Sequence, residues 1–288
     1  MGDWQVGLST GCFYRESILD VLESIRDSGI SVIEICSYPE HLDYHEPEAV
    51  NEASQRIKEL GLEPFSFHAP FADDIDITSP DKDRRDHSLN EILTAVNAAA
   101  HLNVSHFVIH PGPEKEDRPP LEEHLKRLNN AVGILNQVSE FCQLNNLNLI
   151  LENMLPHLLF GRTSDLLWIM GAVDQRNLGI CLDTGHANLS GDLDSVVHKL
   201  SGHLKMVHAA DNSGQYDDHL PPGKGAIDWH RLIQHLMEAS FQGTIIMELS
   251  GDQGITGNAL LQEAVRARQY IRDIIKKIKF DGSAKNPG

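Results

Sequence analysis

Short apolar runs alternate along the chain with longer stretches in which apolar residues recur at helical spacing. The short runs are almost continuously apolar, a pattern that predicts strands buried on both faces, as in a parallel sheet. Eight of them cover residues 6–10, 32–36, 64–68, 106–110, 148–152, 178–183, 204–209 and 243–248. The helical stretches between and after them cover residues 17–28, 47–60, 83–102, 121–145, 164–173, 193–200, 229–239 and 258–279.

Glycine, proline and hydroxyl residues support these boundaries. Gly29 and Gly61 directly follow predicted helices, where a left-handed cap favours glycine. Pro47 suits the first turn of a helix, because proline already has a helical φ and needs no amide partner there. Thr163 or Ser164 is the predicted N-terminal cap of the fifth helix.

Eight consecutive strand-then-helix units predict an α/β fold with a parallel sheet, and eight is the number of strands that closes a (β/α)8 TIM barrel. The chain has 288 residues, slightly more than the roughly 250 typical of one such domain. We therefore expect a single barrel over residues 1–280, followed by a flexible polar tail over residues 281–288. The longest irregular stretches follow strands, which places them at the active-site face: 37–46, 71–82, 111–120 and 211–228.

The composition is that of an ordinary globular protein, and its charge argues against a nucleic-acid partner. Asp and Glu outnumber Lys and Arg by 42 to 24, whereas proteins that bind nucleic acids gain affinity from Lys and Arg on phosphates. The N-terminus lacks the pattern of a signal peptide, and no apolar run approaches the ~18 residues of a membrane span. We expect a cytoplasmic protein without a membrane anchor. Its cysteines have no paired spacing and are predicted to be reduced thiols: Cys12, Cys36, Cys142 and Cys181.

Nine His, Asp and Glu residues fall at or just beyond the ends of predicted strands. They are His68 in FSFHAPF, His110 in FVIHPG, Glu152 in LILEN, Asp183 and His186 in ICLDTGH, His208 in MVHAAD, Asp217 and His219 in YDDHL, and Glu248 in IIMELSG. In a (β/α)8 barrel the carboxyl ends of all strands meet at one face, which carries the active site. The pattern therefore predicts one site built from residues far apart in the chain.

Three of these carboxylates, Glu152, Asp183 and Glu248, each end an apolar run and should be buried in the barrel mouth. A buried ionised carboxylate costs several kcal/mol unless it is paired or binds a metal. Pairing with Lys or Arg is the alternative, but these strands supply only Lys205 as an adjacent basic residue. His208 adds a nitrogen ligand, and such a mixed set suits Mn²⁺, Co²⁺, Mg²⁺ or Zn²⁺.

The other five residues allow two interpretations each. His186 is either a further metal ligand or a group that binds substrate. Asp217 and His219 are two positions apart, so in an extended segment their side chains point the same way and could bind one ion. The alternative is that both belong to a solvated polar loop. His68 and His110 are metal ligands, or histidines of the barrel mouth that bind substrate alone.

The motifs together resemble the xylose-isomerase-like TIM barrel superfamily. The resemblance covers roughly residues 6–250 and rests on HAPF, IHPG, LEN, LDTGH, VHAAD, HLPPGKGAIDW and MELSG in this order. This superfamily includes isomerases and epimerases of sugars and sugar phosphates, and also endonuclease IV. The motif series is specific for the superfamily and does not single out one reaction.

One branch of that superfamily, related to tagatose epimerase and inosose dehydratase, holds one divalent ion with two Glu, one Asp and one His. The resemblance carries these roles to Glu152, Glu248, Asp183 and His208. It further implies that Glu152 and Glu248 are the catalytic pair, which transfers a proton while the ion stabilises an enediolate.

The second branch, endonuclease IV, uses five His, two Asp and two Glu to hold three zinc ions. By resemblance these match all nine residues, which would make the chain a phosphodiesterase with two or three Zn²⁺. The segment ADDIDITSPDKD after HAPF opposes this reading, because it is acidic where DNA would bind. Phe71 is the one candidate for a side chain that enters a duplex.

We favour the first branch: a divalent-metal-dependent isomerase or epimerase of a sugar or sugar phosphate. The nuclease and a related sugar or inosose dehydratase are the alternatives. Besides the ligands, His186, His219, Lys224 and Phe71 are expected to contact the substrate. Lys224, Arg162 and Arg84 are candidates for binding a substrate phosphate, without a motif to choose among them.

Barrels of this superfamily often form homo-oligomers, and no feature of the sequence determines the oligomeric state.

Overall fold

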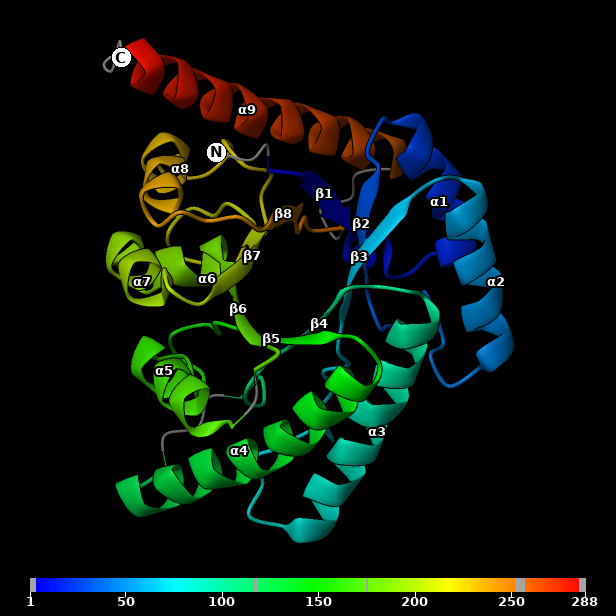
Figure 1. Ribbon diagram of the computed structural model, residues 1–288, viewed down its shortest axis with the longest axis vertical. Helices are drawn as coiled ribbons and strands as arrows, with labels where there is room; N and C mark the ends of the chain where they lie inside the picture. Colours follow the sequence, from blue (N-terminus) through cyan, green and yellow to red (C-terminus); the bar gives the residue numbers. More distant parts are fainter. Residues whose placement is uncertain (1–3, 116–118, 175, 252–256, 285–288) are drawn as a thin grey trace.

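Eight parallel strands form a closed barrel in the order of the sequence (Figure 1). The computed structural model describes residues 4–115, 119–174, 176–251 and 257–284. The strands are β1 (Val6–Ser9), β2 (Val32–Ile35), β3 (Glu63–His68), β4 (His106–Ile109), β5 (Asn148–Glu152), β6 (Leu178–Asp183), β7 (Leu204–Ala209) and β8 (Thr244–Met247). Pairing of β1 with β8 closes the ring. This confirms the predicted (β/α)8 TIM barrel.

Helices surround the barrel on its outer side, and the long α9 packs against β1, α1 and α8 (Figure 1). They are α1 (Ile18–Asp27), α2 (Pro47–Glu59), α3 (Lys82–His101), α4 (Leu121–Leu144), α5 (Thr163–Ala172), α6 (Thr184–Leu189), α7 (Leu193–Leu200), α8 (Trp229–Glu238) and α9 (Gly257–Ala284). Within the described ranges, no helix combines the length and the apolar character needed to cross a bilayer.

The predicted strand ends differ from the observed ones by at most one residue, and two short elements were not predicted. These are the 3-10 helix η1 (Thr10–Phe13) and α6, each of which directly follows a strand. Helix α9 continues to Ala284, past the expected start of the tail at residue 281, and the last four residues lie outside the described ranges.

Two predicted helix ends are confirmed, and one predicted cap is wrong. Gly29 and Gly61 have φ values of 80° and 66°, the left-handed conformation that glycine adopts without strain. Helix α5, however, already includes Thr163, and its cap position is Arg162, whose side chain makes no capping hydrogen bond. The helix therefore begins one residue before the hydroxyl residues that were expected to cap it.

An apolar layer inside the barrel forms the floor of the polar site. Its buried side chains come from six strands: Val32, Val108, Ile150, Cys181, Met206 and Ile246. Side chains alternate between the two faces of a strand, so the residues two positions further on point in the same direction. These are Glu34, His110, Glu152, Asp183, His208 and Glu248. Strand geometry alone therefore places a layer of acidic residues and histidines directly above the apolar one.

Asp211, at the end of β7, braces the long loop that follows that strand. Its side chain is completely buried. Oδ1 accepts hydrogen bonds from the backbone N–H groups of Asn212 and Ile227, at 2.9 and 3.1 Å. Oδ2 accepts from the backbone N–H of Gly223 at 3.0 Å and from Nε1 of Trp229 at 2.8 Å. One carboxylate thus joins the start of the loop to its end and to α8.

The same residue also fixes the middle of the loop. Asp211 and Leu220 exchange two backbone hydrogen bonds, both of 2.8 Å. This pairing turns the chain back toward the barrel and positions Asp217 and His219, which lie just before Leu220. The loop is therefore an ordered part of the fold, held by buried hydrogen bonds.

Replacing Asp211 should destabilise the protein, because Asp211→Ala removes the acceptor of three buried donors and of the partly buried N–H of Gly223. We expect a loss on the order of 3 kcal/mol in the free energy of unfolding, since one unsatisfied buried polar group costs about 1–3 kcal/mol. Denaturant unfolding measures this loss. Asp218→Ala is the matched control, because Asp218 accepts hydrogen bonds from Ser213 in an exposed part of the same loop. That change should cost less than about 1 kcal/mol. Equal midpoints for the two variants would contradict the bracing role.

Candidate metal centre

All nine predicted ligands meet at the carboxyl ends of the strands. Seven of them line one cavity of about 410 Å³: His68, His110, Glu152, His186, Asp217, His219 and Glu248. The other two, Asp183 and His208, are fully buried, and their ligand atoms lie within 4.8 Å of those of Glu152 and Glu248. The structure thus brings together residues that span some 180 positions of the sequence.

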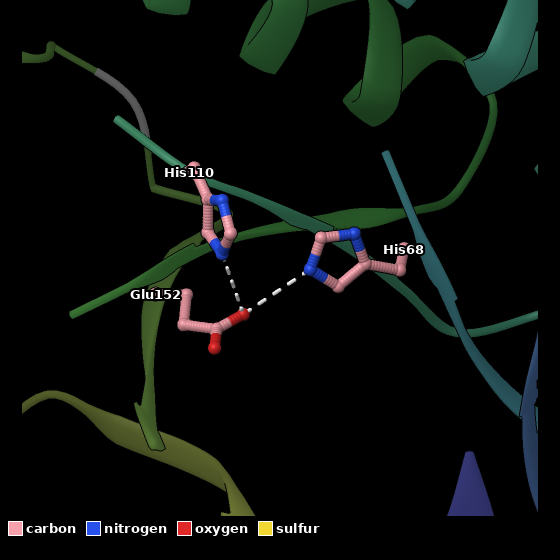
Figure 2. A group of neighbouring side chains, drawn as sticks. All are labelled: His68, His110 and Glu152. Carbon is pink, nitrogen blue, oxygen red and sulfur yellow. Dashed lines mark hydrogen bonds and ion pairs between the residues drawn. The ribbon is translucent and has the colours of Figure 1, made fainter. Parts of the chain in front are cut away.

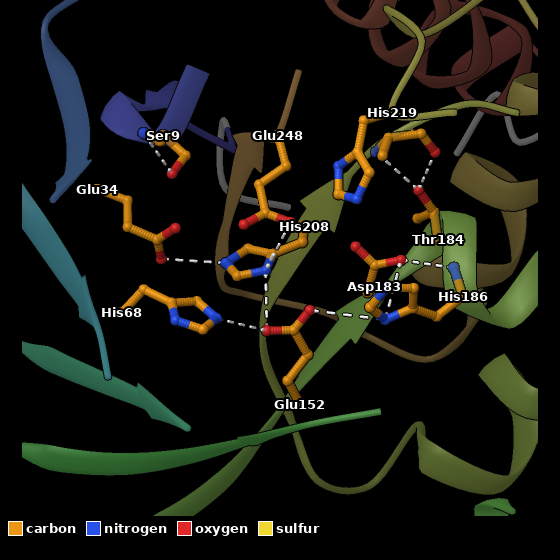
Figure 3. A network of polar contacts seen from close by, with 12 residues as sticks. Ser9, Glu34, His68, Glu152, Asp183, Thr184, His186, His208, His219 and Glu248 are labelled. Atoms are coloured by element: carbon orange, nitrogen blue, oxygen red, sulfur yellow. Dashed lines mark hydrogen bonds and ion pairs between the residues drawn. The ribbon is translucent and has the colours of Figure 1, made fainter. Parts of the chain in front are cut away.

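One compact group consists of Glu152, Asp183, His208 and Glu248, which come from the consecutive strands β5 to β8 (Figure 3). Nδ1 of His208 is 3.2 Å from Oε2 of Glu152 and 3.4 Å from Oε2 of Glu248. Three carboxylates and one imidazole therefore converge on a single point. This set of oxygen and nitrogen donors suits a divalent ion.

A second group shares Glu152 with the first. Nε2 of His68 and Nε2 of His110 lie 3.3 and 3.5 Å from Oε2 of Glu152 (Figure 2). Because this oxygen also faces His208, Glu152 stands between two groups of ligands. It is the one residue common to both.

A third group lies on the other side of the cavity and consists of His186, Asp217 and His219. Oδ2 of Asp217 is 3.3 Å from Nε2 of His186 and 3.0 Å from Nε2 of His219. Asp217 and His219 belong to the loop that Asp211 braces. The alternative of a purely solvated polar loop does not fit this arrangement, because both side chains face the site.

Asp183 and His186 are positioned together by the start of α6. Asp183 is the N-terminal cap of this helix, and its Oδ1 accepts a 2.6 Å hydrogen bond from the backbone N–H of His186. Gly185 lies between them in the helix, outside the left-handed φ region. A Cβ there would be 3.3 Å from Oδ1 of both Asp183 and Asp217, so glycine permits close approach.

Backbone carbonyls orient two of the histidines. Nδ1 of His68 donates to the carbonyl of Ala69 at 2.9 Å, and Nδ1 of His186 donates to the carbonyl of Asn153 at 2.8 Å. A carbonyl only accepts, so the proton of each neutral ring lies on Nδ1. Nε2 then presents its lone pair to the site, as a metal ligand requires.

The backbone of His219 is held in an unfavourable conformation. Its φ is 43°, in the left-handed region, which costs a residue other than glycine roughly 1 kcal/mol or more. The surrounding contacts maintain it, since the carbonyl of His219 accepts a 3.0 Å hydrogen bond from the N–H of Ser250, beyond β8. Strain of this kind is concentrated at functional sites.

Several buried polar atoms in the site have no hydrogen-bond partner. If the residues fit a metal ion, such an ion should satisfy these atoms. Among them are three atoms of the ligand groups: Oδ2 of Asp183, Oδ1 of Asp217 and Nδ1 of His208. Leaving such atoms unsatisfied costs about 1–3 kcal/mol each. All three belong to the ligand groups and are the donor types that divalent ions prefer, so a bound cation would satisfy them.

The electrostatics also favour a cation. Burial lowers the pKa of His110 and of His186, but nearby carboxylates outweigh it and raise both to about 10. Burial raises the pKa of Asp183 to about 6. Burial also raises the pKa of Glu152, yet the neighbouring His208 and His110 outweigh it and lower that pKa well below its usual value. Without an ion, protonated imidazoles neutralise the carboxylates.

Pairing with Lys or Arg, the alternative considered for the buried carboxylates, is not what the structure shows for Glu152. Its ion-pair partners are histidines: His68, His110, His186 and His208. A histidine loses its proton at accessible pH, whereas an arginine does not. A site closed by histidines can therefore exchange protons for a metal ion.

Sequence reasoning missed two acidic residues that contact the ligands. Glu34, in β2, accepts a 3.0 Å hydrogen bond from Nε2 of His208, and Oε1 of Glu114 lies 3.1 Å from Nδ1 of His110. Glu34 interrupts an apolar strand, just as Glu152 ends one, so the same criterion applied within strands would have found it. Glu114 lies in an irregular segment after β4, where no pattern distinguishes it.

The remaining predicted substrate contacts differ in their placement. Phe71 lines the cavity, with its ring centroid 5.2 Å from that of His68. Lys224 is exposed on a turn outside the cavity lining, on the side of Glu263 in α9. Its expected contact with substrate stays a prediction. Arg84 and Arg162 likewise do not line this cavity.

Comparison with known proteins agrees with this architecture. An uncharacterized protein of Methanocaldococcus jannaschii is 28% identical over 280 residues, which cover 95% of this chain and 90% of that protein. A probable endonuclease 4 of Malacoplasma penetrans is 25% identical over 206 residues, covering 64% and 68% of the two chains. The crystal structure of a D-tagatose 3-epimerase-like protein has a TM-score of 0.83 and 26% identity, covering 96% of this chain and 99% of that one.

The family profile described as xylose isomerase-like TIM barrel matches residues 22–274, which include all nine candidate ligands. That range extends from α1 into α9 and so contains nearly the whole barrel. The chain belongs to the xylose isomerase-like TIM barrel family.

Proposed function

We propose that the protein is a divalent-metal-dependent isomerase or epimerase that acts on a sugar or sugar phosphate. The observation that carries the proposal is the placement of Glu152 and Glu248. They extend from β5 and β8, approach the cavity from different sides and both face Nδ1 of His208 (Figure 3). Two carboxylates on either side of one ligand group can act on opposite faces of a bound substrate.

A bound ion in this group would polarise a carbonyl oxygen of the substrate and so acidify the neighbouring C–H bond. One glutamate then removes the proton from that carbon, and the other returns a proton. Return to the same carbon on the opposite face gives an epimerase, and return to the adjacent carbon gives an isomerase. A dehydratase of a sugar or inosose, the related alternative, would begin with the same proton removal and then lose a hydroxyl group.

The rest of the cavity suits a small polar substrate. His186 and His219 border the glutamates and offer hydrogen bonds to hydroxyl groups, and Phe71 supplies an apolar wall. The similar structure described as D-tagatose 3-epimerase-like, at 26% identity over nearly the whole chain, supports a sugar as the substrate.

A second candidate function is a phosphodiesterase of the endonuclease IV kind. The observation in its favour is that the second and third ligand groups stand beside the first, with Glu152 shared. The relative named probable endonuclease 4 supports it as well. This function would use two or three Zn²⁺ and requires cleavage of duplex DNA at an abasic site. Failure of the metal-loaded protein to cleave such DNA would eliminate it.

Metal content distinguishes the two candidates. For an isomerase or epimerase we expect about one Mn, Co or Mg per chain, because four mixed O and N ligands form a single site. Elemental analysis of protein purified without a chelator or a metal-affinity tag gives this ratio. Removal of the ion with a chelator should abolish turnover, and the same ion should restore it. Two or three zinc ions per chain would instead favour the phosphodiesterase.

Changing Glu248 to Gln should leave the fold intact and reduce turnover by roughly 10²–10⁴-fold, the usual contribution of a general acid or base. The assay is incorporation of deuterium from D₂O into ketoses and ketose phosphates, because proton transfer next to a carbonyl exchanges that hydrogen. Glu238→Gln, the same change on the exposed side of α8, is the control and should retain activity. A fully active Glu248→Gln protein would refute this mechanism.

Metal affinity should rise with pH. Burial lowers the pKa of His208, but the carboxylates of Glu248, Glu34 and Glu152 outweigh it and raise the pKa well above its usual value. His208 therefore holds a proton at neutral pH in the metal-free protein, and an ion must displace it to bind. Calorimetry in buffers of different ionisation enthalpy should detect proton release between about pH 6 and pH 8, with tighter binding at the higher pH. Binding without proton release would contradict the raised pKa.

A further inference from the structure

Glu34 is a buried carboxylate that the barrel fold itself does not require. It lies within β2, with no exposed surface, among residues that are all buried. Burying an ionised carboxylate costs several kcal/mol unless good partners compensate. An apolar side chain would fill the same position in the barrel interior without this cost, so the contacts of Glu34 must explain its presence.

Both contacts of Glu34 converge on one oxygen. Its Oε2 accepts a 3.0 Å hydrogen bond from Nε2 of His208 (Figure 3). The same oxygen accepts a 2.8 Å hydrogen bond from Oγ of Ser66. Ser66 is the direct neighbour of Glu34 in the pairing of β2 with β3. The three residues all belong to strands, so the barrel itself holds this arrangement.

The contact with Glu34 determines which nitrogen of His208 faces the ligand group. An ionised carboxylate only accepts hydrogen bonds, so the proton of a neutral His208 ring lies on Nε2. Nδ1 then carries the lone pair. It points at Glu152 and Glu248, at 3.2 and 3.4 Å, and has no hydrogen-bond partner.

We propose that Glu34 is a positioning residue for the metal centre: it holds His208 in the tautomer and orientation that present Nδ1 to the ion. This inference rests on the metal centre of the proposed function. His68 and His186 are oriented by neutral carbonyls, whereas His208 is oriented by a carboxylate. An anionic partner makes the imidazole a stronger ligand, and loss of such a partner typically weakens metal binding by about 10–100-fold.

Three variants test the proposal through the affinity for Zn²⁺, measured by competition with a chelating dye. Glu34→Leu keeps most of the volume and removes the acceptor, and we expect its affinity to fall about 10–100-fold. Glu34→Gln keeps an acceptor oxygen without the charge and should lose less. Glu63→Gln, the same change at an exposed position of β3, is the matched control and should bind like the wild type. Circular dichroism verifies that each variant is folded.

The tautomer provides a readout that a purely structural role of Glu34 would not change. In the metal-free wild-type protein labelled with ¹⁵N-histidine, at a pH high enough to make the His208 ring neutral, NMR should show its remaining proton on Nε2, because no ion is then present to select the tautomer. The His208→Asn variant assigns the signal. Since this measurement uses the unmodified protein, it decides the question even if Glu34→Leu fails to fold.

Two results would overturn the proposal: a proton on Nδ1 of His208, or wild-type Zn²⁺ affinity in Glu34→Leu. Failure of the wild-type protein itself to bind Zn²⁺, Mn²⁺, Co²⁺ or Mg²⁺ would instead refute the metal centre, and with it the proposed function. The two failures are thus separated by the behaviour of the wild type.

Discussion

Buried negative charge at the top of the barrel is the constraint around which the mouth of this protein is organised. Glu34, Glu152 and Asp183 are almost inaccessible to water, and Glu248 projects into the same space. So many carboxylates can share a low-dielectric site only if cations neutralise them. Histidines supply that neutralisation, and they differ from arginines in giving up their protons to an incoming metal ion.

The ligand groups differ in how rigidly they are built. The group of Glu152, Asp183, His208 and Glu248 comes from four adjacent strands, or from residues directly after them, and is as rigid as the barrel. The third group instead depends on the loop that Asp211 braces. Sites on strands keep their geometry more accurately than sites on loops. This difference favours one ion site whose geometry the strands fix in advance. Binding of any further ion would depend on the position of the loop.

The same secondary contacts recur around the site. Asp183 caps α6 with one oxygen and leaves the other facing the ligand group. Asn153 accepts a hydrogen bond from the backbone of Asp183, and its carbonyl accepts one from His186. Each of these contacts fixes the direction of a ligand before any ion binds. An ion then needs little reorganisation of the protein.

The amino-acid sequence was sufficient to predict the barrel and the nine candidate ligands. Strand runs with turn residues are local signals, and a parallel barrel gathers all strand ends at one face. It could not reveal α6, which is only six residues long. Nor could it show that Asp217, from a distant loop, approaches Gly185 closely. The contact between Glu34 and His208 is seen only in the folded chain, because the two residues are 174 positions apart and meet only when the barrel closes.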